Sequence, residues 1–236
     1  MFKPDTLRRR WGRDGLVPLA VLLLAGLGGI DAMAQPAAVA QGQQIASGGT
    51  PQGVPACAGC HGARGEGSGD FPRLAGTGRV YLQAQLDAFA SGARQNPIMQ
   101  AFAQKLTPDE RIAVASYYSQ LAAPASANPA PKTPTPADAG GWLATRGRWA
   151  DQLPACAQCH GVDGAGVGGQ FPPLAGLPEN YIREQLAAWK AHARPPGPLG
   201  LMPVVAAKLS DADVTGVAQY YAGLLRAPAA DTGNSK

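Results

Sequence analysis

Residues that carry chemistry are few in this chain: its 236 residues include only four cysteines, four methionines and three histidines. Charged residues are also scarce, at 15%, whereas hydrophobic residues reach 45%. This composition is too apolar for a disordered chain, and 31 glycines with 22 prolines are too many for one long helical array. The sequence therefore predicts a globular protein in which each Cys, Met and His can be weighed individually.

The chain lacks an apolar run long enough to cross a bilayer comfortably, although a shorter run lies near its start. Residues 16–30 are mostly apolar but fall short of the ~20 residues that a spanning helix needs. Five basic residues precede this run, and Ala32-Met33-Ala34 follows it. A basic start, an apolar middle and an A-x-A site predict a signal peptide over residues 1–34 and an exported protein. Cleavage after Ala40 and retention of the leader as an anchor are the alternatives.

A strong charge of one sign is absent as well. The formal net charge of +4 falls to +2 once the leader removes five basic and three acidic residues. No basic cluster with interleaved aromatic residues is left in the mature part, so the sequence does not support nucleic-acid binding.

An internal repeat organises the rest of the chain. The paired segments are 57–62 with 156–161, 71–76 with 171–176, 81–86 with 181–186, and 117–118 with 220–221. Two copies of a unit this long indicate a duplicated domain, because solenoid repeats are typically about 20 to 50 residues long and need at least three copies. Residues 123–140 between the copies are rich in Pro and Ala and predict an extended linker. We therefore expect domain 1 at residues 40–122 and domain 2 at residues 141–226.

Helical patterns dominate both copies, and no convincing alternating strand is found. Thr107 lies three residues before Glu110, the spacing of a capping box, and Ser210 opens the same pattern in domain 2. Further helices are expected around residues 82–89 and 182–189, with short ones around 39–46 and 142–150. These patterns predict an all-α fold.

All four cysteines lie in two C-x-x-C-H motifs, which are the strongest signal in the chain. The motifs are Cys57-Ala-Gly-Cys60-His61 and Cys156-Ala-Gln-Cys159-His160. This pattern is typical of covalent haem c attachment, in which two thiols on one turn each add to a haem vinyl group. The adjacent imidazole is then placed to ligate the iron. We therefore predict Cys57, Cys60, Cys156 and Cys159 as haem-binding residues, and His61 and His160 as iron ligands.

Three other interpretations of the cysteines are weaker. A four-Cys zinc site normally separates its two pairs by about 15 to 20 residues, whereas Cys60 and Cys156 lie far apart in the chain. A thioredoxin-like redox pair needs a βαβ context that is missing. Two plain disulfides suit an exported protein, but they leave the paired histidines unexplained.

A second iron ligand in each domain follows by elimination. Met1 and Met33 leave with the leader, so Met99 and Met202 remain, one in each domain and each shortly before the last helix. A thioether is a suitable axial ligand, and Met/His coordination suits electron transfer. A methionine that only fills core space is the alternative. The matched positions favour Met99 and Met202 as ligands.

Several other residues near the motifs have two interpretations. His192 is a rival iron ligand, but it aligns with Gly92 and is better explained as a solvated residue at a helix end. Tyr81 and Tyr181 either donate hydrogen bonds to haem propionates or are core aromatics with a polar tip. Arg73 and Arg79 could neutralise propionates in domain 1, although the corresponding places in domain 2 hold no arginine.

The paired segments together resemble the two-domain class I cytochromes c of the cytochrome c4 type. The resemblance rests on the duplicated C-x-x-C-H-G, F-P-x-L-A-G and Y-x-x-x-Q-L segments, the single Met and the final Y-Y, and it covers almost the whole mature chain. It implies two tandem all-α class I cytochrome c domains joined by a Pro-rich linker, with two covalently attached haem c groups, in a periplasmic electron carrier. By this resemblance Cys57, Cys60, His61 and Met99 serve one haem, and Cys156, Cys159, His160 and Met202 serve the other.

Two departures from that family are visible. The linker is long and Pro-rich for tightly docked domains, and residues 192–201 form an insertion that could reshape the rim near the second haem.

The function expected from these features is electron transfer and not catalysis. Two irons closed by His and Met suit single-electron exchange with a membrane cytochrome complex, a terminal oxidase or a dehydrogenase. A dihaem oxidoreductase or peroxidase-like enzyme with one open iron is the first alternative, and a cytochrome subunit of a dehydrogenase complex is the second. Peripheral membrane association is left open.

Overall fold

The computed structural model describes residues 29–124, 133–197 and 199–224, and this part of the chain is helical with four isolated β-bridges and no strand. Domain 1 contains α1 (Gly29–Gly48), α2 (Ala58–His61), α3 (Arg79–Ala90), α4 (Pro97–Ala103) and α5 (Pro108–Gln120). Domain 2 contains α6 (Ala139–Arg146), η1 (Trp149–Asp151), α7 (Ala157–His160), η2 (Val162–Gly164), α8 (Glu179–Lys190), α9 (Leu201–Ala207) and α10 (Asp211–Ala222). The predicted all-α fold class is confirmed.

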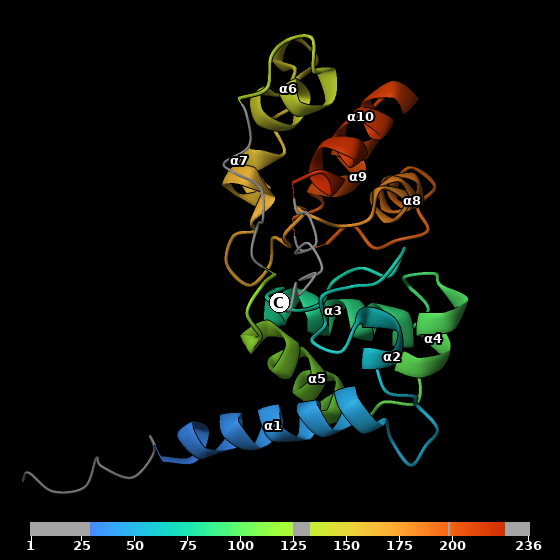
Figure 1. Cartoon of the computed structure of the whole chain (residues 1–236). Helices are drawn as coiled ribbons and strands as arrows, with labels where there is room; N and C mark the ends of the chain where they lie inside the picture. The colour runs from blue at the N-terminus through green and yellow to red at the C-terminus, as the bar shows by residue number, and fades with distance from the viewer. Residues whose placement is uncertain (1–28, 125–132, 198, 225–236) are drawn as a thin grey trace, which may run out of the picture.

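The two domains are stacked one on the other, and α1 lies across the end of domain 1 that is far from domain 2, beside α5 (Figure 1). Each domain has its own hydrophobic core. The core of domain 1 is built around Val114, Ala115 and Tyr118 of α5, and that of domain 2 around Val217, Ala218 and Tyr221 of α10. The last helix of each domain therefore carries the central part of its core.

Both last helices begin at the predicted capping boxes. The Thr107 hydroxyl accepts from the Glu110 amide at 3.2 Å, and the Glu110 carboxylate accepts from the Thr107 amide at 2.7 Å. Ser210 and Asp213 repeat this exchange at 3.1 and 2.8 Å. Each box satisfies two amides that a helix start leaves unpaired.

In each domain the first and last helices cross at a glycine. A Cβ atom added to Gly42 of α1 would lie 2.1 Å from the Ala113 carbonyl oxygen of α5. One added to Gly140 of α6 would lie 2.2 Å from the Gly216 carbonyl oxygen of α10. The two helix pairs therefore touch backbone to backbone, which only glycine permits at these positions.

Helix bounds differ from the sequence prediction at three places. The helix expected around residues 142–150 ends at Arg146, because Gly147 adopts a φ of 73°, and a 3-10 turn follows. The helix expected around residues 39–46 is longer and begins at Gly29. The short helices α4 and α9 were not expected.

Parts of the predicted leader and linker lie outside the described residues. These are residues 1–28 of the leader and 125–132 of the linker. Helix α1 passes through both predicted cleavage sites, after Ala34 and after Ala40. In the described part of the chain, no helix combines the length and the apolar character that a membrane crossing requires.

Candidate functional site

Each C-x-x-C-H motif forms one short helical turn. In α2 the His61 amide donates to the Cys57 carbonyl at 3.0 Å, and in α7 the His160 amide donates to the Cys156 carbonyl at 2.9 Å. One turn therefore carries two thiols and an imidazole, as haem attachment requires. Burial raises the pKa of Cys57, and it raises the pKa of Cys156 to about 11, so both thiols are protonated at neutral pH.

The two motif histidines are fixed in the same way. His61 Nδ1 lies 2.7 Å from the Pro72 carbonyl oxygen, and His160 Nδ1 lies 2.8 Å from the Pro172 carbonyl oxygen. Because a carbonyl only accepts, Nδ1 carries the proton and donates, which leaves Nε2 as the lone-pair nitrogen. Burial lowers the pKa of both histidines and keeps the imidazoles neutral. A neutral imidazole with a hydrogen-bonded Nδ1 is the form that ligates a metal.

Met99 and Met202 lie on the two helices that the sequence analysis missed. Met99 lies in α4, where the Asn96 side chain caps the helix by accepting from the Met99 amide at 2.9 Å. Met202 lies in α9, which begins after Gly200 in a left-handed conformation with a φ of 62°. The thioethers therefore sit at the starts of matched helices in the two domains.

One cavity of about 1060 Å³ brings all eight predicted site residues together. It is lined by Cys57, Cys60, His61, Met99, Cys156, Cys159, His160 and Met202. Its volume lies at the upper end of the roughly 300–1,000 Å³ of a typical ligand site, large enough for a bulky group. Most of its other lining residues are apolar and come from both domains.

Three buried arginines give the cavity its electrostatic character. Arg73, Arg94 and Arg194 line it and are only 6%, 6% and 5% exposed. Among the described residues none of the three forms an ion pair with a carboxylate, and the Arg73 Nε has no hydrogen-bond partner. Buried charges without counterions are costly, so an anionic group bound in the cavity would stabilise these arginines. A large apolar macrocycle with carboxylate side chains, such as haem, fits both its lining and its charge.

Arg94 and Arg194 face each other across the domain boundary. Arg94 donates to the Tyr181 hydroxyl at 3.0 Å and to Gln185 Oε1 at 2.6 Å. Arg194 donates to the Tyr81 hydroxyl at 2.6 Å and to Gln85 Oε1 at 3.1 Å. Each arginine therefore binds the Tyr-Gln pair of the opposite domain, which makes the interface pseudo-symmetric.

The hydroxyls of Tyr81 and Tyr181 have a role that neither sequence interpretation included. Each hydroxyl lines the cavity but accepts from an arginine of the other domain. Burial by itself raises the Tyr181 pKa, but the charges of Arg94 and Arg194 outweigh it and bring the pKa below its ordinary value. The two domains are in contact despite the long Pro-rich linker, and a further backbone hydrogen bond runs from the Gln95 amide to the Ala193 carbonyl at 3.2 Å.

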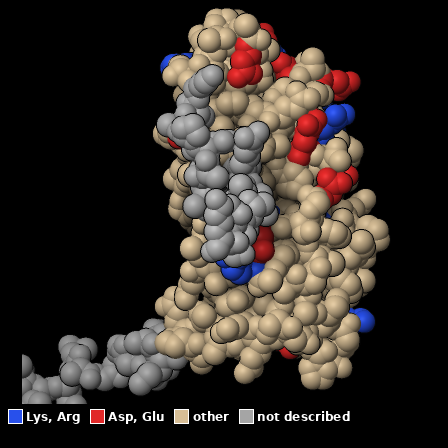
Figure 2. Space-filling view, in the orientation of Figure 1, with Lys and Arg blue, Asp and Glu red and all other residues tan. Residues whose placement is uncertain are grey.

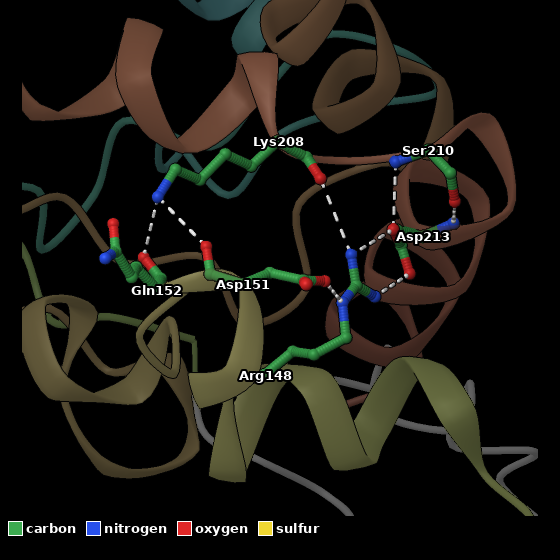
Figure 3. A network of polar contacts seen from close by, with 6 residues as sticks. All are labelled: Arg148, Asp151, Gln152, Lys208, Ser210 and Asp213. Atoms are coloured by element: carbon green, nitrogen blue, oxygen red, sulfur yellow. Dashed lines mark hydrogen bonds and ion pairs between the residues drawn. The ribbon is translucent and has the colours of Figure 1, made fainter.

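A network of hydrogen bonds and ion pairs fixes the segment before the C-x-x-C-H motif of domain 2 (Figure 3). Arg148 donates to both carboxylate oxygens of Asp213, at 2.9 and 3.1 Å, and also to Asp151. Lys208, at the end of α9, donates to the carbonyls of Asp151 and Gln152 at 3.0 and 3.1 Å. The segment that leads to Cys156 is thereby tied to the helix that carries Met202 and to the start of α10.

The described residues do not support a four-Cys zinc site, disulfides between the cysteines, or His192 as an iron ligand. No group of three or more His, Cys, Asp or Glu side chains in this part of the chain is placed to hold a metal ion, so the two cysteine pairs do not form a four-Cys site. No disulfide joins the cysteines. His192 is exposed just after α8, with a φ of 55°, and does not line the cavity.

A helical fold in two halves, each with a haem-attachment turn on a shared cavity, defines a two-domain c-type cytochrome. The cytochrome c family model matches residues 39–122 and 150–224, and the chain belongs to the cytochrome c family.

Individual relatives show which type of cytochrome c this chain resembles most. A thiosulfate dehydrogenase electron acceptor of Stutzerimonas stutzeri (strain A1501) is 42% identical over 85% of this chain and 94% of its own length. The structure of reduced recombinant cytochrome c4 from Pseudomonas stutzeri matches with a TM-score of 0.65 and 29% identity, over 79% of this chain and 98% of that one. The predicted cytochrome c4 type is confirmed, and with it electron transfer in place of catalysis.

A second structure is a thiosulfate dehydrogenase (TsdBA) from Marichromatium purpuratum. It matches with a TM-score of 0.70 and 42% identity over 78% of this chain. This chain spans 40% of the length of that protein.

Proposed function

We propose that this protein is an exported, periplasmic electron carrier with two haem c groups that accepts electrons from a thiosulfate dehydrogenase. The observation that carries the proposal is the single cavity on which both C-x-x-C-H turns and both methionines meet. The donor is inferred from the 42% identity to a thiosulfate dehydrogenase electron acceptor. The predicted leader supports export.

The cysteines, histidines, prolines and methionines of each domain would have different roles in holding a haem. Cys57 and Cys60 in domain 1 would bind one haem through thioether bonds, and Cys156 and Cys159 the other. Pro72 and Pro172 orient the imidazoles of His61 and His160 through the Nδ1 hydrogen bonds. Met99 and Met202 would complete the iron coordination, and each bound haem supplies a one-electron Fe(III)/Fe(II) couple. With a histidine and a methionine bound to each iron, neither iron would be open to a substrate.

The rim of the cavity suits brief contact with a redox partner. Exposed apolar side chains, Ile98 in domain 1 and Leu199 and Leu201 in domain 2, line the cavity at its surface. Lys and Arg are sparse on the face shown in Figure 2, and acidic side chains gather on the domain 2 end of that face. Two ionised propionates per haem would change the mature charge from +2 to about −2, too little for strong steering by net charge. Partner contact therefore depends on local surface.

Rapid mixing with a purified thiosulfate dehydrogenase tests the proposal. The oxidised holoprotein should be reduced quickly when dehydrogenase and thiosulfate are both present, with two electrons taken up per chain. Omission of the dehydrogenase and replacement of the carrier by a monohaem class I cytochrome c are the controls. Reduction no faster than with the monohaem protein would reject the proposed donor. Oxidation of thiosulfate by the protein alone would support the enzyme alternative.

A further inference from the structure

The second tyrosine of each Tyr-Tyr pair lies at the centre of its domain, on the wall of the cavity. Tyr118 of α5 and Tyr221 of α10 are each only 2% exposed, and both line the cavity. The Tyr221 hydroxyl is buried and has no hydrogen-bond partner of normal geometry among the described residues. Buried polar groups are nearly always paired, because an unpaired one destabilises the fold. This hydroxyl is therefore available to a group bound in the cavity.

Each of these tyrosines is fixed at both its backbone and its ring. The Gly176 amide donates to the Tyr221 carbonyl at 2.8 Å, and a Cβ atom added to Gly164 would lie 2.7 Å from Tyr221 Cε1. Tyr118 makes the same two contacts with the matching glycines of domain 1, at 3.1 and 2.6 Å. Each ring is therefore held against the loop that follows its C-x-x-C-H motif, and the position of its hydroxyl is fixed.

The first cysteine of each motif lies beside the tyrosine of its own domain. Cys156 packs against the core cluster that contains Tyr221, and Cys57 packs against the cluster that contains Tyr118. The second cysteines of the motifs do not pack against these clusters. Burial raises the pKa of all four side chains, and a weak hydroxyl–thiol interaction lowers the pKa of each cysteine while it raises that of each tyrosine. The same pair of groups thus meets in both domains.

We infer that Tyr118 and Tyr221 are positioning residues for haem attachment, each of which donates a hydrogen bond from its hydroxyl to the sulfur of the first motif cysteine. Once that cysteine is part of a thioether, its sulfur carries no hydrogen and can only accept, so it matches a hydroxyl that has a hydrogen to donate. The inference rests on the proposed haem attachment. It gives the last helix of each domain a direct contact with the point at which its haem would be bound.

Removal of the hydroxyl alone tests the inference, because a donating hydroxyl and an unpaired one predict different effects. Tyr221→Phe keeps the buried ring. If the hydroxyl donates to the thioether sulfur, its loss should raise the unfolding equilibrium constant of the holoprotein roughly two- to tenfold in denaturant unfolding. If the hydroxyl has no partner, its loss should leave that constant unchanged or lower it.

Resonance Raman spectra of the same holoproteins provide a readout that a purely structural role would not change. The carbon–sulfur stretching band of the thioether should shift in Tyr221→Phe, and Tyr118→Phe should shift the corresponding band of domain 1. Tyr220→Phe is the matched control, because it removes a hydroxyl from a half-buried neighbouring ring that does not line the cavity. It should leave the carbon–sulfur bands in place.

The possible outcomes separate this inference from the proposed function. A Tyr221→Phe holoprotein with unchanged or greater stability, or with an unshifted carbon–sulfur band, overturns the inference. If Tyr221→Phe does not assemble with haem, Tyr118→Phe decides by the same two measurements in domain 1. Failure of the proposed function would appear elsewhere, as a fully loaded holoprotein that the thiosulfate dehydrogenase does not reduce.

Discussion

Arg94 and Arg194 share their acceptors across the domain interface: the Oε1 atoms of Gln85 and Gln185 each accept from both guanidinium groups, at distances between 2.6 and 3.1 Å. Two buried like charges are thus held close together without a carboxylate among the described residues. Each guanidinium also stacks on an aromatic ring of its own domain, Arg94 on Phe89 at 4.5 Å and Arg194 on Trp189 at 4.0 Å. The arrangement holds the two domains together and concentrates positive charge on the wall of the cavity.

Removal of one of these arginines should loosen the interface. Arg94→Met removes the hydrogen bonds to the Tyr181 hydroxyl and to Gln185 that cross the interface. A lost hydrogen bond typically costs about 0.5–1.5 kcal/mol, so we expect a lower free energy of unfolding and a larger radius of gyration by small-angle scattering. Arg183→Met, at an exposed arginine of α8 that pairs only with Glu179 among the described ion pairs, is the control. Equal behaviour of the two variants would contradict the interface account.

The helix crossing in domain 1 should not tolerate a methyl group. Gly42→Ala would place a Cβ 2.1 Å from the Ala113 carbonyl oxygen, and overpacking of this kind typically costs ~1–3 kcal/mol. Gly48→Ala, at the end of the same helix, meets nothing within 4 Å and should be nearly neutral. Thermal unfolding of the holoprotein compares the two variants. A Gly42→Ala protein as stable as Gly48→Ala would show that α1 and α5 do not approach so closely.

The stability of the protein at low pH should depend on the ion pair between Arg148 and Asp213. Hydrogen bonds from Arg148 lower the pKa of Asp213 from 3.8 to about 2. A carboxyl whose pKa is depressed by folding stabilises the protein above its unfolded value, and the stabilisation is lost as pH falls through that window, here from about 4 to about 2. Arg148→Gln should bring the Asp213 pKa back up and move the acid-unfolding midpoint to higher pH. Arg146→Gln, in the preceding turn, should leave the midpoint unchanged, and the same shift in both variants would refute the assignment.

Loss of one methionine should open one iron. In Met99→Ala, half of the weak far-red absorption of Met-ligated ferric haem should disappear, and carbon monoxide should bind the reduced protein at once to one site per chain. Ile98→Ala removes an exposed neighbour in the same helix and should change neither signal. A Met99→Ala spectrum identical to that of the wild type would show that Met99 only fills space.

The sequence predicts the fold class and the motif turns because those features are local or repeated. The C-x-x-C-H motifs and the capping boxes at Thr107 and Ser210 each depend on residues a few positions apart. The helices α4 and α9 are too short for an apolar period to show. Asn96-Pro97 was a usable start signal for α4, whereas α9 begins at Gly200 without a side-chain cap.

The arginine pair was missed for a different reason. Besides the glutamine of its own domain, each guanidinium binds a tyrosine and a glutamine more than 80 residues away in the other domain, and no single-domain pattern contains that information. A signal was nevertheless present, because Ala93-Arg94 returns as Ala193-Arg194 and Gln85 returns as Gln185. A repeated buried arginine beside a repeated glutamine is a pairing that the duplication itself could have revealed.

The most direct test of the account is a quantitative absorption spectrum of the exported protein, oxidised and reduced, with haem counted per chain. The account predicts two haems per chain, far-red absorption at full strength for two Met-ligated irons, and no change on brief exposure to cyanide or carbon monoxide. One haem per chain, or half of the far-red absorption together with immediate binding of a small ligand, would contradict it and would favour an enzyme with an open iron.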